Sequence, residues 1–385
     1  MLFGLFASLP ALGEPLPACT FPDDEPALYV LTVEPRPTLI HQFGHTALLA
    51  WDPRQADFSP VYDYGRFSLP PSIVDTVVNY LTMQQAYYVS TNPLRKSRRT
   101  YRRYARGVVA QRLALTDAEG LQLLGDINRD VNEHPEFRYN WYSANCSTKI
   151  RDRIDGVLGG RIREQMQTPS GTSPAGEVLR HTARHPLWLG LQWGSTRFAR
   201  QEIADWDAMF LPDPMRVRMD RALRRDGSPL VAETCRIMPD SQPPILAGPP
   251  SRWAGLAAIG IGLAAALVAL LRVSRSAGLV AIGAIGAGLG TWGTAALIVG
   301  LAGTFAPFWG HDNLAFASPL WLVVPVAAFA AGRGAAWPAT VGAALLGLAA
   351  LGTLGSLVFG FAAGNLGFAL LFLPLTAAVA WGLGA

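Results

Sequence analysis

Hydrophobic and polar positions are distributed very unevenly along the chain. Beyond Arg252 the sequence consists of long apolar runs rich in Gly and Ala. Runs of this length predict membrane-spanning helices, because about 20 apolar residues cross the hydrocarbon core of a bilayer. The predicted spans lie at about 253–271, 278–303, 318–332, 338–361 and 366–384. The third is short and would need help from its flanks or local thinning of the bilayer. We therefore expect an all-α transmembrane helical bundle of about five spans over 247–385.

The few charges in this region predict its orientation. Arg272 and Arg275 lie between the first two predicted spans, and Arg333 lies between the third and the fourth. The other two loops contain no Lys or Arg. Positively charged loops remain in the cytoplasm, so an odd number of spans places the upstream part of the chain outside it, in the periplasm or at the cell exterior.

The upstream part is charged and Pro-bearing, which indicates a soluble domain over about 26–246. Strand-like stretches occur at 46–51, 60–64 and 107–115, and helical spacing occurs over 72–80. Thr116 and Glu119 form a capping-box pattern that opens a helix to about Asn132. A further helix is predicted to begin at Cys146. The soluble domain is therefore expected to be α+β.

The amino-terminal segment 1–25 has features of a leader. Residues 1–13 are apolar and include small residues near a cleavage position, although the basic start of a signal peptide is missing. The stretch 16–19 also faintly resembles a lipidation site. The three cysteines are too few for a disulfide framework. Cys19 and Cys235 flank the soluble domain and either pair with each other or remain thiols, which leaves Cys146 free.

Cys146 is the strongest candidate for chemistry. It follows an aromatic stretch and Asn145, a residue that caps helices, so its sulfur is expected at a helix N-terminus. Unpaired N–H groups and the helix dipole favour a thiolate there. A thiolate paired with an imidazole can attack a carbonyl and carry the acyl group, and the Cys146 N–H would point at the oxyanion that develops.

Two histidines compete as the base. His45 enters a predicted strand from a Gly-containing turn, and His41 precedes it by four residues. On the next strand, Asp63 or Tyr64 could hold the second ring nitrogen of His45. We expect Asp63, because a carboxylate fixes the tautomer and stabilises the imidazolium. No further cluster of His or Cys residues accompanies His41 and His45 to complete a zinc site. Neither a metal site nor a cofactor is therefore predicted.

Two further polar segments have competing interpretations. The run 95–106 is densely basic, and its interleaved tyrosines could suggest nucleic acid. A location outside the cytoplasm argues against that partner, so the run is either a solvated helix face or a contact with anionic phospholipid headgroups, which we favour. His311 and Asp312 occupy the predicted outer loop between the second and third spans, where they either contact a headgroup or belong to an ordinary interfacial loop.

Several of these segments together resemble one family. They are His45–Leu49, Tyr64–Phe67, Arg106–Leu115, Arg138–Tyr142, Asn145–Asp152 and Asp207–Pro212, with His311–Leu314 and Pro319 in the membrane region. The sequence resembles the Lnb-type bacterial lipoprotein N-acyltransferases, most clearly in the run Asn-Cys-x-Thr-x-x-Arg-Asp. The resemblance covers most of 40–215 and, more loosely, the spans. It implies a periplasmic, permuted papain-like (NlpC-like) domain on a bacterial inner-membrane protein.

The resemblance also implies roles and partners. Cys146 would be the nucleophile and His45 its base, whereas Asp63 rests on the chemical argument alone. On chemical grounds, and not through the resemblance, Arg106, His41, Tyr64 and Asn145, together with His311 and Asp312, are expected to support the site or bind the substrate. The implied activity is transfer of an acyl group through a Cys thioester to the lipidated N-terminal Cys of lipoproteins. The partners would be diacylated lipoproteins or phospholipids in a membrane. A cysteine peptidase or amidase of the envelope and a non-catalytic envelope binding protein are the alternatives.

Overall fold

A computed structural model describes residues 16–384, apart from 37, 39–40, 69, 71, 134–135, 187, 197, 303–311 and 359–362. The chain forms two compact units, each made from several stretches of sequence. The sheet unit takes residues up to 69, 85–170 and 204–244, and the helical unit takes 70–84, 171–203 and 245–385. An α+β domain followed by membrane-type helices is confirmed, whereas the permuted papain-like assignment stays a prediction.

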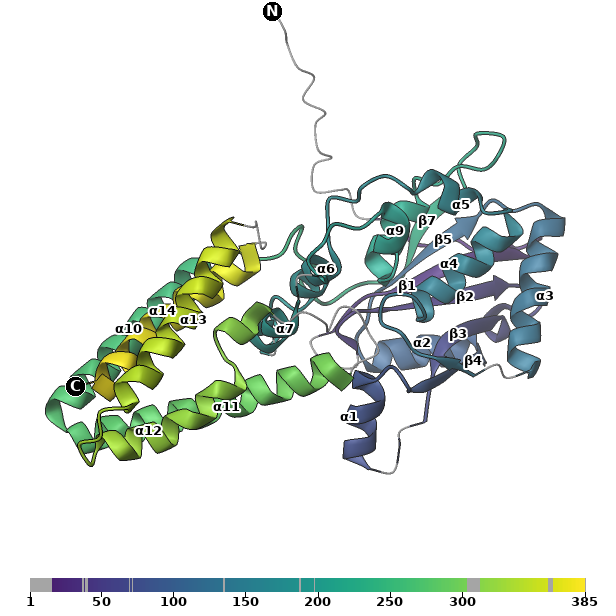
Figure 1. Ribbon diagram of the computed structural model, residues 1–385. Coiled ribbons are helices and arrows are strands. Elements are labelled where there is room, and N and C mark those ends of the chain that lie inside the picture. Colours follow the sequence, from purple (N-terminus) through teal and green to yellow (C-terminus); the bar gives the residue numbers. More distant parts are fainter. Residues whose placement is uncertain are drawn as a thin grey trace, which may run out of the picture. The chain divides into compact units, whose positions relative to one another are not determined.

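The sheet unit is built on a seven-stranded sheet in which neighbouring strands are antiparallel (Figure 1). Its order is β6-β4-β3-β2-β1-β5-β7. The strands are β1 Ala27–Val33, β2 His45–Trp51, β3 Pro60–Arg66, β4 Ala86–Pro93, β5 Val108–Leu113, β6 Phe137–Arg138 and β7 Val231–Met238. The predicted strands β2, β3 and β5 are present. The interior strand β1, whose apolar run is buried, was not predicted from the sequence.

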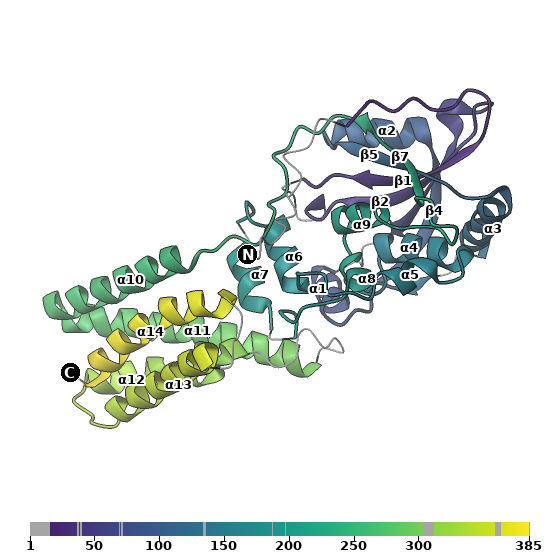
Figure 2. The same cartoon turned by 90° about the horizontal axis from the view of Figure 1, so that it is seen from above.

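Helices cover both faces of this sheet (Figure 2). One face packs against α4 (Cys146–Val157) and, with it, α3 Asp117–Glu133, α5 Arg161–Gln165, α8 Asp205–Ala208 and α9 Pro212–Met219. The opposite face packs against α2 (Leu94–Arg103). Because side chains alternate along a strand, Leu48 of β2 joins the α4 face while Ala47 and Leu49 join the α2 face. The short helix η2 (Ala56–Phe58) connects β2 to β3.

Two local predictions can be compared directly with the structure. Thr116 and Glu119 form the predicted capping box at the start of α3, because the Thr116 N–H donates to Glu119 Oε2 at 2.7 Å and the Glu119 N–H donates to Thr116 Oγ1 at 3.3 Å. Cys19 and Cys235 form a disulfide, with their Cα atoms 4.9 Å apart. The disulfide decides between the two alternatives for these cysteines. It also removes Cys19 as a lipidation site and ties the segment before β1 to β7.

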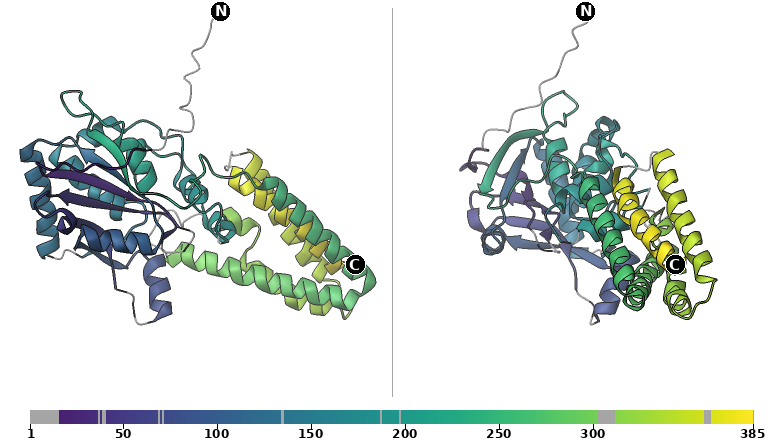
Figure 3. Two further views of the ribbon diagram at one scale, coloured as in Figure 1. Left: turned by 180° about the vertical axis from the view of Figure 1, so that it is seen from behind. Right: turned by 90° about the vertical axis from the view of Figure 1, so that its left-hand side faces the viewer.

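The helical unit contains the predicted membrane helices. Its elements are α1 Ile73–Leu81, α6 Pro174–His181, α7 Trp188–Gly194, α10 Trp253–Val273, α11 Arg275–Ala302, η4 Asp312–Ala315, η5 Pro319–Val323, α12 Val324–Ala331, α13 Pro338–Val358 and α14 Ala363–Gly384. Among the described residues, five segments are long and apolar enough to cross a membrane. Helix α14 lies beside α10 and α13, and α11 lies beside α12 (Figure 3).

The third candidate span differs from a continuous α-helix. It covers Asn313–Ala331, in which the 3-10 helices η4 and η5 precede the short helix α12. Pro319 and Pro325 lie at the starts of η5 and α12, where the missing N–H of proline does no harm to a helix but prevents an earlier one from continuing. The flanks thus supply the length that this short apolar run lacks.

Candidate active site

The start of helix α4 is fixed by a complete capping box. Asn145 is the N-cap, and its Oδ1 accepts from the Ser147 N–H at 2.9 Å and the Thr148 N–H at 3.1 Å. Thr148 Oγ1 in turn accepts from the Asn145 N–H at 2.8 Å. The Asn145 amide also donates to the carbonyl of Phe210 at 3.0 Å. These bonds place Cys146 at the first position of the helix, where backbone N–H groups lack intrahelical acceptors.

The rest of the recognisable run around Cys146 anchors the helix. The guanidinium of Arg151 donates to the carbonyl of Trp206 at 2.8 Å and lies 3.8 Å from the centre of its ring. Asp152 pairs with Arg151 at 2.7 Å. The regular spacing of Asn, Thr and Arg along this segment therefore reflects the capping and anchoring of α4.

His45 begins strand β2 and forms a close pair with Asp63. The preceding Gly44 has φ +82°, and a Cβ there would lie 2.8 Å from the carbonyl oxygen of Val33, so glycine is needed at this turn. Ala47 is opposite Asp63 in the β2–β3 ladder, which places His45 and Asp63 on the same face. His45 Nε2 lies 2.7 Å from Asp63 Oδ1, with 20% and 14% of the two side chains exposed.

Cys146 reaches the same imidazole. Its side chain is hydrogen-bonded to His45, and since Nε2 faces Asp63, Nδ1 is the ring nitrogen left for the sulfur. Burial raises the pKa of the thiol, but the His45 charge and hydrogen bond, then donors from Thr46 and Ser147, lower it overall. Burial likewise lowers the pKa of His45, whereas Cys146 and Asp63 raise it to about 10. The favoured state is a thiolate–imidazolium pair.

Tyr64 lies away from this pair. It projects from the α4 face of β3, where its hydroxyl donates to Asp130 Oδ2 at 2.5 Å. Asp130 is also paired with Arg153. Strand alternation explains why Asp63 meets His45 and its neighbour Tyr64 does not. Of the two alternatives for the second ring nitrogen of His45, Asp63 lies beside the ring, and Tyr64 forms a bond to α3 instead.

His41 and Arg106 lie near the pair, but among the described residues the hydrogen bonds to the sulfur come from His45, Thr46 and Ser147. His41 Nδ1 is 3.0 Å from Thr38 Oγ1, and its ring lies 5.0 Å from that of Tyr104. Burial, and then the charge of Arg106, lower the pKa of His41. Arg106 is only 5% exposed and donates to the carbonyls of Glu34 and Val33 at 2.9 and 3.2 Å. It secures the end of β1 and places a buried positive charge behind Cys146 and Asp63.

Three residues at the site were missed by sequence reasoning. Thr46 Oγ1 and Ser147 Oγ are 2.8 Å apart and fully buried, so they connect the strand of the base to the helix of the nucleophile. Gly65 lies at a bulge in β3, and a Cβ there would be 3.0 Å from His45 Cε1. The only sequence signal was their position beside Cys146, His45 and Tyr64, because each acts through a tertiary contact.

The other predictions from the sequence concerned metal ligands and the residues His311 and Asp312. Within the described ranges, no group of three His, Cys, Asp or Glu residues is placed to hold a metal ion. His311 lies outside the described residues, and only the backbone of Asp312, at the start of η4, is described.

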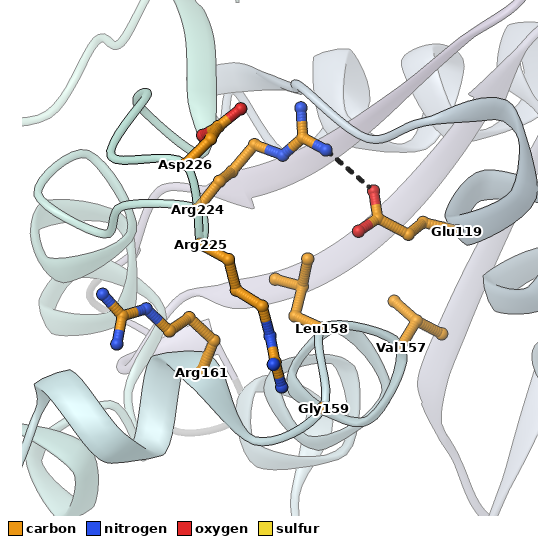
Figure 4. A pocket seen from close by; sticks show the side chains of 8 residues that line it. All are labelled: Glu119, Val157, Leu158, Gly159, Arg161, Arg224, Arg225 and Asp226. Carbon is orange, nitrogen blue, oxygen red and sulfur yellow. Dashed lines mark hydrogen bonds and ion pairs between the residues drawn. The ribbon is translucent and has the colours of Figure 1, made fainter.

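A pocket of roughly 390 Å³ lies at the other end of α4 (Figure 4). Arg224 crosses it to Glu119 at 3.2 Å, and Arg225 and Arg161 extend from neighbouring turns. Its walls are Glu119, Val157, Leu158, Gly159, Arg161, Arg224, Arg225 and Asp226. Because α4 has 12 residues, rising about 1.5 Å each, this pocket is separate from Cys146.

The fold and the site define a class: a multi-pass membrane protein whose α+β domain carries a Cys-His-Asp cluster at the end of an antiparallel sheet. Residues 21–180 match the family model of the Lnb N-terminal periplasmic domain. This segment is therefore similar to an Lnb N-terminal periplasmic domain, in agreement with the resemblance seen in the sequence. Cys146, His45 and Asp63 all lie within the matched segment. The comparisons with curated proteins and with solved structures gave no match.

Proposed function

We propose that this protein is a cysteine-dependent lipoprotein N-acyltransferase of the bacterial inner membrane, with the sheet unit in the periplasm. The observation that supports the proposal is the clustering of Cys146, His45 and Asp63, within a segment that matches the Lnb family model. The shifts in the pKa of Cys146 and His45 favour a thiolate–imidazolium pair there. A thiolate is a strong nucleophile that can take up an acyl group at neutral pH, whereas a protonated thiol is a weak nucleophile. The membrane helices of the same chain favour a substrate with long acyl chains.

In the first half-reaction, the Cys146 thiolate attacks the ester carbonyl of a diacylated lipoprotein or a phospholipid. The N-terminus of α4, with the Cys146 N–H, faces the negative charge that develops on the carbonyl oxygen. When the carbon–oxygen bond breaks, the imidazolium of His45 gives its proton to the leaving alkoxide. A thioester and a neutral imidazole remain.

In the second half-reaction, the α-amine of a lipoprotein's lipidated N-terminal cysteine attacks the thioester. His45 now accepts the proton from the amine as the carbon–sulfur bond breaks. The products are an N-acylated lipoprotein and the thiolate–imidazolium pair with which the cycle began. Asp63 stabilises the imidazolium at both ends of the cycle and fixes the orientation of the ring.

The test is the identity of the product. Purified full-length protein is incubated with a synthetic diacylated lipopeptide, with and without a phospholipid, and the peptide is analysed by mass spectrometry. The proposal predicts a peptide that has gained one fatty acyl group on its α-amine. A peptide cleaved at an amide bond would support the peptidase or amidase alternative instead. A Cys146→Ser variant that folds, inserts and keeps full biological activity would support a non-catalytic binding protein.

A further inference from the structure

Helix α2 has a strongly basic outer face. It contains six Lys and Arg residues among ten, and its buried positions are Leu94, Ser97 and Tyr101. Their spacing defines the side that packs on the sheet. The cations on the opposite side, which we call the basic face, are Arg95, Lys96, Arg99, Arg102 and Arg103, and all of them are exposed.

The charges of the basic face are poorly balanced by the protein. In the described part of the chain, Arg98 is the member of α2 that forms an ion pair, with Asp57 at 3.1 Å. The guanidinium of Arg95 lies 4.1 Å above the ring of Phe58, which is 55% exposed. Like charges three or four residues apart destabilise an isolated helix. A helix that keeps this pattern, next to an exposed aromatic ring, fits a surface that meets an external anion.

The basic face continues toward the active site. At the end of α2, the carbonyl of Tyr104 accepts a hydrogen bond from the Arg36 guanidinium, and the Tyr104 ring lies 5.0 Å from the ring of His41. The carbonyl of His41 accepts from the Gly44 N–H at 3.2 Å, immediately before His45. A chain of direct contacts therefore links the basic face to the loop that leads into the strand of the base.

We propose that the basic face of α2 binds the phosphates of anionic phospholipid headgroups, which brings the donor lipid of the proposed acyl transfer to Cys146. This inference deepens the proposed function and rests on it for the fate of the bound lipid. A bilayer surface supplies many phosphates at once, and each nearby cation adds to the electrostatic attraction. Phe58 and Tyr104 are exposed aromatic rings beside these cations, and tyrosine is a residue type enriched at headgroup level.

The binding test uses the full chain with Cys146→Ala, so that no lipid is consumed. Short-chain phosphatidylglycerol and short-chain phosphatidylcholine are titrated in detergent, and bound lipids are counted by native mass spectrometry. The test variant combines Arg99→Gln, Arg102→Gln and Arg103→Gln. A charge-matched control combines Arg138→Gln, Arg221→Gln and Arg225→Gln, which are exposed arginines elsewhere on the sheet unit. A third variant replaces Arg99, Arg102 and Arg103 with Lys.

We expect the test variant to bind phosphatidylglycerol at least tenfold more weakly, with phosphatidylcholine binding unchanged. The control should lose little, the lysine variant should retain most of the affinity, and high salt should abolish the difference. Equal losses in test and control variants, or no preference for phosphatidylglycerol, would overturn the inference. Stronger binding of an oligonucleotide that depends on the same arginines would also overturn it.

Failure of this inference can be distinguished from failure of the proposed function. If phosphatidylglycerol binds through the basic face but no acyl group appears on Cys146 of the wild type, the headgroup site stands and the acyl transfer does not. If the acyl adduct forms equally fast with the test variant and with either lipid, acyl transfer stands and the headgroup site is rejected.

Discussion

The contacts that fix the geometry within the sheet unit differ in kind from those within the helical unit. In the sheet unit, specific hydrogen bonds fix the important geometry, as in the Asn145 cap of α4 and the pair of His45 with Asp63. In the helical unit, close backbone approach does so. A Cβ at Gly260 of α10 would lie 2.4 Å from the carbonyl oxygen of Leu371, and one at Gly293 of α11 would lie 2.4 Å from that of Ala317.

This difference follows from the solvents in which the two units are expected to fold, which are water for the sheet unit and lipid for the helical unit. Water competes for polar groups and drives apolar side chains inward, so a polar constellation in the sheet unit needs a complete set of partners to persist. In lipid the side chains gain little from leaving the solvent, and helices associate through small residues that allow dense packing. Changes at the site should therefore alter chemistry, and changes at the glycines should alter assembly.

The largest chemical effect is expected for Asp63→Asn. The amide keeps the size of the side chain but cannot stabilise the imidazolium, so the pKa of His45 should fall and that of Cys146 should rise. We expect the rate of acyl-enzyme formation at neutral pH to drop by about 10²- to 10⁴-fold, measured by quenched-flow mass spectrometry. Tyr64→Phe is the neighbouring control. It should cost about 1 kcal/mol of stability through the lost bond to Asp130 and leave the pH profile unchanged.

Gly293→Ala tests whether close backbone approach stabilises the helical unit. The added methyl would meet backbone atoms of the segment before η5, which cannot move aside cheaply. We expect a loss of about 1–3 kcal/mol in stability, visible as a lower melting temperature in detergent, with the thiol pKa unchanged. Gly288→Ala in the same helix, where nothing lies within 4 Å of a Cβ, should be harmless. A shifted thiol pKa in Gly293→Ala would break the proposed separation of roles.

Gly65→Ala should produce a smaller chemical effect. Its methyl would press on the His45 ring at 3.0 Å and displace it by a few tenths of an ångström. Misplacement by 1 Å can cost about 10²-fold, so a fall of roughly tenfold in acyl transfer is reasonable. Steady-state kinetics provide the measurement. Gly125→Ala on α3, with open space around it, is the control and should leave activity intact. Equal activities for the two variants would show that the bulge does not position the base.

Ser147→Ala should produce the smallest effect, and one that depends on pH. The hydroxyl helps to lower the thiol pKa, so its removal should raise that pKa. Below the pKa, the thiolate fraction and the rate should fall by about two- to fivefold, on the order of one lost hydrogen bond. At higher pH the two rates should converge. The decline as pH rises through about 10, the pKa of His45, should be the same in both proteins. A uniform loss at every pH would indicate a merely structural role.

The sequence predicted those parts that depend on local pattern. The Asn145 cap, strands β2 and β3 and the candidate spans follow from nearest-neighbour chemistry and hydropathy. The choice of Asp63 over Tyr64 required only side-chain chemistry, and strand alternation places Asp63 beside His45. The catalytic roles themselves remain predictions.

Other features needed the tertiary structure. Thr46 and Ser147 are 101 positions apart in the sequence, and no local sequence pattern predicts the hydrogen bond between their hydroxyl groups. The bulge at Gly65 could not be predicted from the sequence either, because glycine occurs in many kinds of turn. The buried run of β1 could have been read as a strand from its apolar composition, but its interior place in the sheet depends on pairing with both β2 and β5.

A direct test of the thioester intermediate is the intact mass of the purified protein after incubation with a phospholipid or with a diacylated lipopeptide whose α-amine is blocked. We expect a mass increase of one fatty acyl chain, located on Cys146, removed by hydroxylamine and missing in Cys146→Ala. We also expect the adduct to disappear when an acceptor lipopeptide with a free α-amine is added. An unmodified wild-type protein that nevertheless produces N-acylated lipopeptide would contradict the account.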